Sequence, residues 1–272
     1  MLIATSCATL LLATPTAFAA VTEQLIDLVK PNGTTLRYLL TSDPGAPTSD
    51  TGIVLFAGSQ GQVGLASGIP NPGSNFLVRS RHYFSEDGLT TATYDPSSDL
   101  GALSDSLRSS REHADEVAMI LTDMRKRTGV KKIYLVGTSR GTISAANVAV
   151  RLPSDVDGVV LTSTVFRASR GGGGLQGFDF ATITQPLLFV HHVSDACKVT
   201  SPGYAQALDG RYPVIWVEGS EGSQGDACGP FSNHGYLGRE AATVHAISAW
   251  ILRRQLTHRI TENTPMGEQP PK

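Results

Sequence analysis

The pentapeptide Gly137-Thr138-Ser139-Arg140-Gly141 places a serine between two glycines in a G-x-S-x-G pattern. The apolar residues 133–136 before it are typical of a strand buried on both faces, and residues 142–152 after it are predicted to form a helix. A serine on such a tight turn projects its hydroxyl away from the sheet, and its neighbours must be small. The pattern predicts that Ser139 is a nucleophile. The alternative is a glycine-bounded turn with a surface serine.

A serine nucleophile needs a base to take its proton and an acid to orient that base. Of the seven histidines, His234 lies in a loop after the last predicted strand. Such a loop can return to the carboxyl edge of the sheet, where function gathers in open α/β proteins. We therefore expect His234 to be the base, the alternative being a surface loop histidine.

The acid should also leave the end of a strand, and Asp195 does so after the predicted strand at residues 187–190. The alternative role for Asp195 is turn formation. Other acids that could orient the histidine are Asp179, Asp226 and Glu218.

Acyl transfer also requires N–H donors for the oxyanion of the tetrahedral intermediate. The N–H of Arg140, directly after the nucleophile, is one expected donor. The loop Ser59-Gln60-Gly61 follows an early strand, and we expect the Gln60 N–H to be the second donor. The alternative is a plain glycine-rich turn. The glycine spacing of this loop matches neither a dinucleotide-binding nor a P-loop motif.

The N-terminal residues 1–19 are predicted to be an export signal, because residues 2–19 carry no charge and Ala17-Phe18-Ala19 resembles a cleavage site. No Lys or Arg precedes the apolar stretch, which is atypical. A membrane anchor and a lipoprotein signal at Cys7 are the alternatives. The expected location is secreted or periplasmic, and no other segment is long and apolar enough to cross a membrane.

Removal of the signal would leave two of the three cysteines, Cys197 and Cys228. An oxidising compartment would permit a disulfide between them, the alternative being two free thiols. Cys197 lies two residues after Asp195, and Cys228 lies six before His234. A bond would therefore tie the acid loop to the base loop.

Composition and element order predict the fold class. The chain has 272 residues and a net charge of −2, which gives no case for nucleic-acid binding. Predicted strands and helices alternate, which indicates one α/β domain over residues 20–272, with a mostly parallel sheet covered by helices on both faces. The segment from Thr257 onward, rich in proline, is predicted to be frayed. The predicted strands lie within 24–38 and at 53–56, 89–94, 133–136, 158–162, 187–190 and 214–217, and the helices at 75–84, 111–128, 142–152, 202–208 and 238–255.

Over residues 53–255 the chain resembles the α/β-hydrolase superfamily. The resemblance rests on the G-x-S-x-G elbow and on the chain order Ser139, Asp195, His234. It implies a sheet of about eight strands and hydrolysis through an acyl-enzyme, without a metal or an organic cofactor. The oxyanion loop lacks the His-Gly-Gly-Gly form of many lipases. The short region between residues 165 and 183 indicates that no long lid is present.

The expected function is a serine hydrolase acting on small-molecule or polymeric carboxylic esters, with Ser139, His234 and Asp195 as its triad. Amidase, thioesterase or acyltransferase activity would use the same residues. The alternative from another class is a non-catalytic binding protein on this fold. A metal site at His191 and His192 lacks a third ligand in the sequence. Nothing in the sequence indicates the oligomeric state.

Overall fold

The computed structural model describes residues 21–47, 49–70, 75–253 and 255–264. The predicted export signal at residues 1–19, including Cys7, lies outside this part of the chain. None of the described helices combines the length and the hydropathy needed to span a bilayer.

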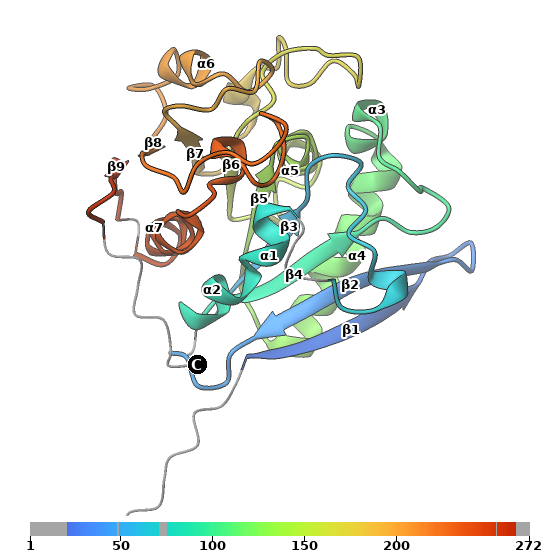
Figure 1. The fold of residues 1–272 in the computed structure, drawn as a ribbon. Coiled ribbons are helices and arrows are strands. Elements are labelled where there is room, and N and C mark those ends of the chain that lie inside the picture. The colour runs from blue at the N-terminus through green and yellow to red at the C-terminus, as the bar shows by residue number, and fades with distance from the viewer. Residues whose placement is uncertain (1–20, 48, 71–74, 254, 265–272) are drawn as a thin grey trace, which may run out of the picture.

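A mixed sheet forms the centre of the fold (Figure 1). Over the described residues the sheet has nine strands, in the order β1-β2-β4-β3-β5-β6-β7-β8-β9. The first two form an antiparallel hairpin, β2 pairs antiparallel with β4, and the remaining neighbours are parallel. The predicted mostly parallel sheet is confirmed. The strands are β1 (Thr22–Val29), β2 (Thr35–Ser42), β3 (Thr51–Phe56), β4 (Thr90–Asp95), β5 (Lys132–Thr138), β6 (Gly158–Thr162), β7 (Leu187–His192), β8 (Val214–Val217) and β9 (Arg259–Ile260).

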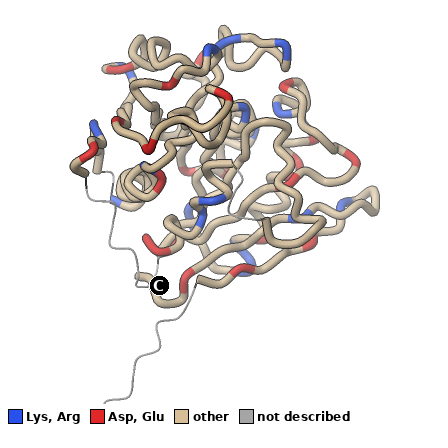
Figure 2. The backbone as a smooth tube through the Cα atoms, in the orientation of Figure 1, with Lys and Arg blue, Asp and Glu red and all other residues tan. Residues whose placement is uncertain are grey.

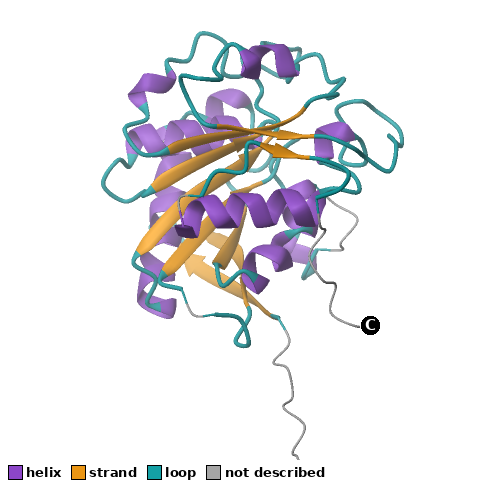
Figure 3. Cartoon of the chain, turned by 90° about the vertical axis from the view of Figure 1, so that its left-hand side faces the viewer, coloured by secondary structure: helices purple, strands orange, loops and turns teal. Residues whose placement is uncertain are grey.

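Helices cover both faces of the sheet, as the alternating pattern predicts (Figure 3). One face packs against α4 and α5, and the other against α1, α2 and α7, so that two apolar cores form. Parallel strands buried on both faces explain why β3, β5 and β7 are almost continuously apolar. The helices are α1 (Phe76–Arg79), α2 (Arg81–Glu86), α3 (Asp105–Arg108), α4 (Arg111–Thr128), α5 (Gly141–Arg151), α6 (Pro202–Gln206) and α7 (Glu240–Arg253), with single 3-10 turns η1 (Leu65–Ser67), η2 (Phe180–Thr182) and η3 (Asn233–Gly235).

The long helix α4 shows how local sequence sets these elements. Ser110 caps its N-terminus by accepting a hydrogen bond from the backbone N–H of His113. Gly129 ends it in a left-handed conformation, with φ of 76°. Val117, Ile120 and Met124 recur at helical spacing and are buried against the sheet.

Three elements differ from the sequence prediction. The helix expected at residues 75–84 is divided at Ser80 into α1 and α2, because Ser80 has a non-helical ψ of 6°. The short helix α3 was not predicted, since four residues are too few for a periodic pattern. The prediction of a frayed segment from Thr257 onward is wrong for Arg259 and Ile260, which pair with β8 as a ninth strand. A strand of two residues is too short to show the alternation of apolar and polar side chains from which strands are predicted.

The region expected to lack a lid does lack one. Residues 165–183 are all described, and their regular structure consists of the η2 turn and an isolated bridge between Ser169 and Gly172. The site at the carboxyl edge of the sheet is therefore not covered by an inserted helical subdomain. Basic and acidic residues are spread over the whole fold, with neither sign gathered in one region of the view (Figure 2).

Candidate active site

Ser139 occupies a strained turn between β5 and α5. Its φ is 52°, in the left-handed region that a residue with a side chain rarely adopts. The flanking glycines are required by contact. A Cβ on Gly137 would lie 2.4 Å from the Gly141 carbonyl oxygen, and one on Gly141 would lie 2.1 Å from the Phe56 carbonyl oxygen. The strand, G-x-S-x-G turn and helix predicted from sequence are confirmed.

Asp195 and His234 meet at the same edge, although 39 residues separate them. Asp195 Oδ2 lies 3.1 Å from His234 Nδ1, and the two residues are 5% and 4% exposed. A hydrogen bond donated by Nδ1–H to the carboxylate leaves Nε2 unprotonated and able to accept a proton. This is the arrangement that a general base requires.

Two further bonds orient the Asp195 carboxylate. The backbone N–H of Cys197 donates to Oδ1 over 2.9 Å, and Thr200 Oγ1 donates to Oδ2 over 2.8 Å. Thr200 Oγ1 also lies 3.1 Å from His234 Nδ1. The sequence analysis missed Thr200, because one threonine in a loop carries no signal of its own.

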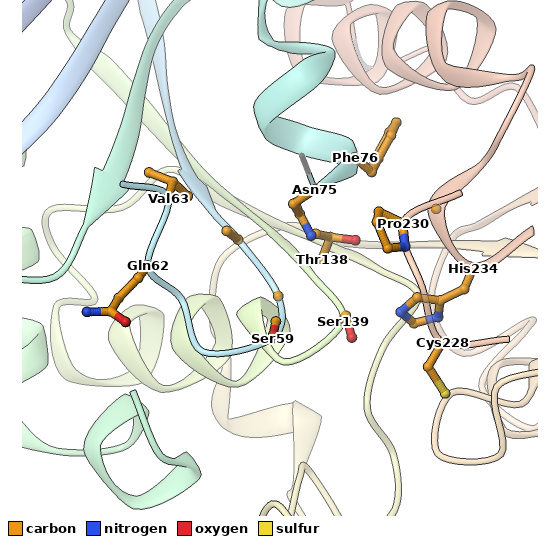
Figure 4. Close-up of a pocket in the computed structure, with 13 residues that line it drawn as sticks. Ser59, Gln62, Val63, Asn75, Phe76, Thr138, Ser139, Cys228, Pro230 and His234 are labelled. Carbon is orange, nitrogen blue, oxygen red and sulfur yellow. The ribbon is translucent and has the colours of Figure 1, made fainter. Parts of the chain in front are cut away.

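Ser139 and His234 line one pocket of about 320 Å³ (Figure 4). In this view Ser139 lies between Ser59 and His234. His234 Nε2 is buried and has no hydrogen-bond partner among the described residues. No described protein group therefore competes for this nitrogen. The lining residues are Ala57, Gly58, Ser59, Gln62, Val63, Asn75, Phe76, Thr138, Ser139, Cys228, Pro230, His234 and Gly235.

The structure contains the expected disulfide between Cys197 and Cys228. Cys197 follows β7 on the loop of Asp195, and Cys228 precedes η3, which carries His234. The bond therefore joins the two loops whose side chains form the Asp195–His234 pair.

The loop expected to supply the second oxyanion donor lies beside Ser139. A Cβ on Gly58 would lie 2.9 Å from Ser139 Cβ, so glycine permits this close approach. Ser59 lines the pocket, whereas the Gln60 side chain is exposed and does not. The Gln60 side chain thus points elsewhere, and the role of its backbone N–H stays a prediction.

Arg140, the other expected oxyanion donor, has a side chain with a separate structural task. Its guanidinium pairs with Asp105 of α3, with Arg140 Nε 2.8 Å from Asp105 Oδ1. It also donates to the Gly171 carbonyl oxygen over 2.8 Å, and Asp105 accepts from the Gly174 N–H. This cluster ties the loop that contains Gly171 and Gly174 to the turn at Ser139 and leaves the Arg140 backbone at the start of α5.

The alternative acids have other partners. Asp179 caps η2 through the N–H of Ala181, and Asp226 accepts from the N–H of Cys228. Glu218 forms an ion pair with Arg259. Each of these carboxylates thus has a partner other than His234.

His191 and His192 point to different partners, as strand alternation predicts. His191 Nε2 accepts from the Thr164 N–H and its ring stacks on Phe166, whereas His192 Nε2 lies 2.8 Å from the Gly219 carbonyl oxygen. Burial lowers the pKa of His191 to about 3, so it is neutral. Over the described residues, no group of three His, Cys, Asp or Glu side chains is placed to hold a metal ion.

Comparisons with known proteins agree with this architecture. The family model described as alpha/beta hydrolase fold matches residues 71–183. No curated protein sequence matches the chain.

Several solved structures share its fold. One is a serine hydrolase without a lid from Xanthomonas campestris, with 12% identity and a TM-score of 0.56 over 82% of this chain and 94% of that one. A cold-adapted esterase from an Arctic intertidal metagenomic library has 14% identity and a TM-score of 0.54 over 84% and 93%. The fluorophosphonate-binding serine hydrolase FphF of Staphylococcus aureus has 12% identity and a TM-score of 0.56 over 86% and 99%. At these identities the likeness concerns the fold, and together with the family match over residues 71–183 it shows that this chain has the alpha/beta hydrolase fold.

Proposed function

We propose that this chain is a serine hydrolase that cleaves carboxylic esters through an acyl-enzyme, with Ser139 as nucleophile, His234 as base and Asp195 as orienting acid. The observation that carries the proposal is the buried Asp195–His234 pair, whose free Nε2 belongs to a residue lining the same pocket as Ser139. A surface histidine or a turn-forming aspartate would not need this arrangement. The alpha/beta hydrolase fold, shared with a serine hydrolase without a lid, supports the same interpretation.

In the acylation step, Ser139 Oγ attacks the ester carbonyl carbon while its proton passes to His234 Nε2. The backbone N–H groups of Arg140 and Gln60 stabilise the negative oxygen of the tetrahedral intermediate. The C–O bond to the alcohol then breaks, and the imidazolium returns the proton to the leaving alcohol. Asp195 stabilises the imidazolium throughout.

Deacylation repeats the steps with water as the nucleophile. His234 Nε2 takes a proton from the water, the hydroxide oxygen bonds to the acyl carbon, and the acid is released as Ser139 regains its proton. No step requires a cofactor. The same residues could transfer an acyl group from an amide or a thioester, so these activities are alternatives to be separated by substrate choice.

The pocket favours a compact acyl or alcohol group. Its volume of about 320 Å³ is at the small end for ligand pockets. Phe76, Val63 and Pro230 supply apolar contacts, and the described residues include no lid that would extend the apolar surface for a long chain. Because the site is open, a short ester or the exposed ester of a polymer would fit.

Hydrolysis of p-nitrophenyl esters from acetate to long acyl chains tests the proposal, with Ser139→Ala beside the wild type. We expect wild-type activity that falls with chain length and is lost in the variant, which should keep its fold by circular dichroism. A fluorophosphonate probe should label the wild type at Ser139. Absence of hydrolysis on every ester and amide, together with an unlabelled Ser139, would favour a non-catalytic binding protein.

We also propose that the protein is exported and loses residues 1–19. The disulfide between Cys197 and Cys228 supports an oxidising compartment. Expression with the complete N-terminus, followed by mass spectrometry of the mature chain, tests this. The expected N-terminus is Ala20, and an uncut protein retained inside the cell would contradict the proposal.

A further inference from the structure

Arg108, the last residue of α3, is a buried cation. It is 1% exposed. Its Nη1 donates to Ser144 Oγ on α5 over 2.9 Å, and its Nη2 donates to the Ser59 carbonyl oxygen over 3.1 Å. Nε has no partner within the described part of the chain. Burial, together with the nearby Arg140, lowers the pKa of Arg108 to about 10, which still leaves it charged at neutral pH.

No described carboxylate forms an ion pair with Arg108. Asp105, three residues earlier on the same helix, is bonded to the Arg140 side chain and to the Gly174 N–H. A buried charge without an opposite charge in contact lowers the stability of a fold. Features that cost stability are expected where function requires them. The position of Arg108 therefore calls for a functional reason.

Arg108 donates a hydrogen bond to one particular peptide unit, the one between Ser59 and Gln60. The Ser59 carbonyl and the Gln60 N–H belong to the same peptide unit, which is trans because the described chain has no cis bond. A peptide unit is planar, so fixing the direction of its carbonyl also fixes the direction of its N–H. A hydrogen bond from a cation to the carbonyl also polarises the N–H and makes it a stronger donor.

The rest of the loop is built around the same bond. Ser59 has a φ of 51°, which for a residue with a side chain requires support from its surroundings. The Gln60 carbonyl accepts from the Leu103 N–H over 2.8 Å, and the Gly58 carbonyl accepts from the Gly61 N–H over 2.9 Å. A Cβ on Gly61 would lie 2.9 Å from Arg108 Nη2, so glycine leaves the room that the guanidinium needs.

We propose that Arg108 is a positioning residue for the oxyanion donor of this loop: it orients and polarises the Ser59–Gln60 peptide whose N–H faces the developing negative charge. Its second bond, to Ser144 on the elbow helix, fixes the loop relative to the nucleophile. The inference rests on the proposed serine hydrolase function, because an oxyanion forms only if Ser139 attacks a carbonyl.

The test compares Arg108→Met, Arg108→Lys and a matched control, Arg81→Met. Arg81 is also buried, at 6% exposure, but it lies on α2 and pairs with Glu23. On a p-nitrophenyl ester we expect Arg108→Met to lower kcat about 10- to 100-fold while KM stays within about threefold, since the donor acts mainly in the transition state. Arg108→Lys should also lower kcat, because one ammonium cannot hold Ser59 and Ser144 together. Arg81→Met should lower the Tm and leave kcat unchanged.

The outcomes separate this inference from the proposed function. Wild-type kcat in Arg108→Met, or a loss equal to that in Arg81→Met, would overturn the positioning role. If Arg108→Met does not fold by circular dichroism, Arg108→Lys decides: wild-type kcat in that variant overturns the inference, and a reduced kcat with unchanged KM supports it. A wild type that hydrolyses nothing and is not labelled by fluorophosphonate overturns the proposed function itself, and this inference with it.

Discussion

Cys197 and Cys228 form a disulfide that joins the loop of Asp195 to the loop of His234. Cys197 also donates its backbone N–H to Asp195 Oδ1 over 2.9 Å. The same residue therefore forms the disulfide and fixes the direction of the Asp195 carboxylate. The bond closes a loop of 31 residues. The loops of Asp195 and His234 are thereby held together by one covalent bond as well as by the Asp195–His234 contact.

Replacing both cysteines by serine should therefore lower stability and activity together. The loss of unfolding free energy should be about 3–4 kcal/mol for a loop of this length, measured by urea unfolding. The kcat for a short p-nitrophenyl ester should fall because the acid and base loops gain freedom. A double variant with the urea midpoint and the kcat of the wild type would contradict the stabilising role of the disulfide.

Asp195→Asn tests the orienting acid. The amide preserves shape but removes the charge and favours the wrong imidazole tautomer, so kcat should fall by about 10⁴-fold. Asp179→Asn is the matched control, because Asp179 caps η2 and has no contact with His234. We expect its kcat to remain within about twofold of the wild type, as for surface substitutions in general. Equal losses in both variants would argue against Asp195 as the acid.

Gly141→Ala should damage the elbow. The new Cβ would lie 2.1 Å from the Phe56 carbonyl oxygen, and backbone cannot move aside as a flexible side chain would. We expect a loss of about 3 kcal/mol or more in unfolding free energy, together with loss of activity. Gly173→Ala is the control, since a Cβ there would meet nothing within 4 Å. Near-equal urea midpoints for the two variants would show that the contact with the Phe56 carbonyl oxygen does not restrict residue 141 to glycine.

His113 should make the protein sensitive to acid. Burial, aided by the nearby Arg108, lowers the pKa of His113 to about 3, against 6.5 for the unperturbed group. Between these values the unfolded chain binds a proton that the folded chain does not, so stability is present above pH 6.5 and is lost as pH falls towards 3. Each such group contributes a slope of about 1.4 kcal/mol per pH unit.

His113→Phe removes this group, so the slope of unfolding free energy against pH should decrease by about 1.4 kcal/mol per unit between pH 6 and pH 4. Urea unfolding at several pH values measures it. His258→Gln, at an exposed histidine, should leave the slope unchanged. The same slope in His113→Phe and wild type would mean that His113 titrates normally in the folded protein.

The strand, tight turn and helix around Ser139 could be predicted from the sequence because they depend on local patterns. The apolar run before Gly137, the small residues at 137 and 141, and the helix after them each depend on residues that are close in the chain. The order of Ser139, Asp195 and His234 along alternating strands and helices was enough to place all three at one edge, because parallel strands end there.

The tertiary structure decided what depends on long-range contact. Residues from separate elements meet in the contact of Thr200 with His234, in the ion pair of Arg140 with Asp105, and in the hydrogen bond from Arg108 to the Ser59 carbonyl oxygen. No periodic pattern marks a lone Thr, Asp or Arg for such a partner, since the partner is set by how the helices and loops pack. The sequence alone thus determined the tight turn at Ser139 and the fold that presents it, while packing determined which side chains orient the groups around it.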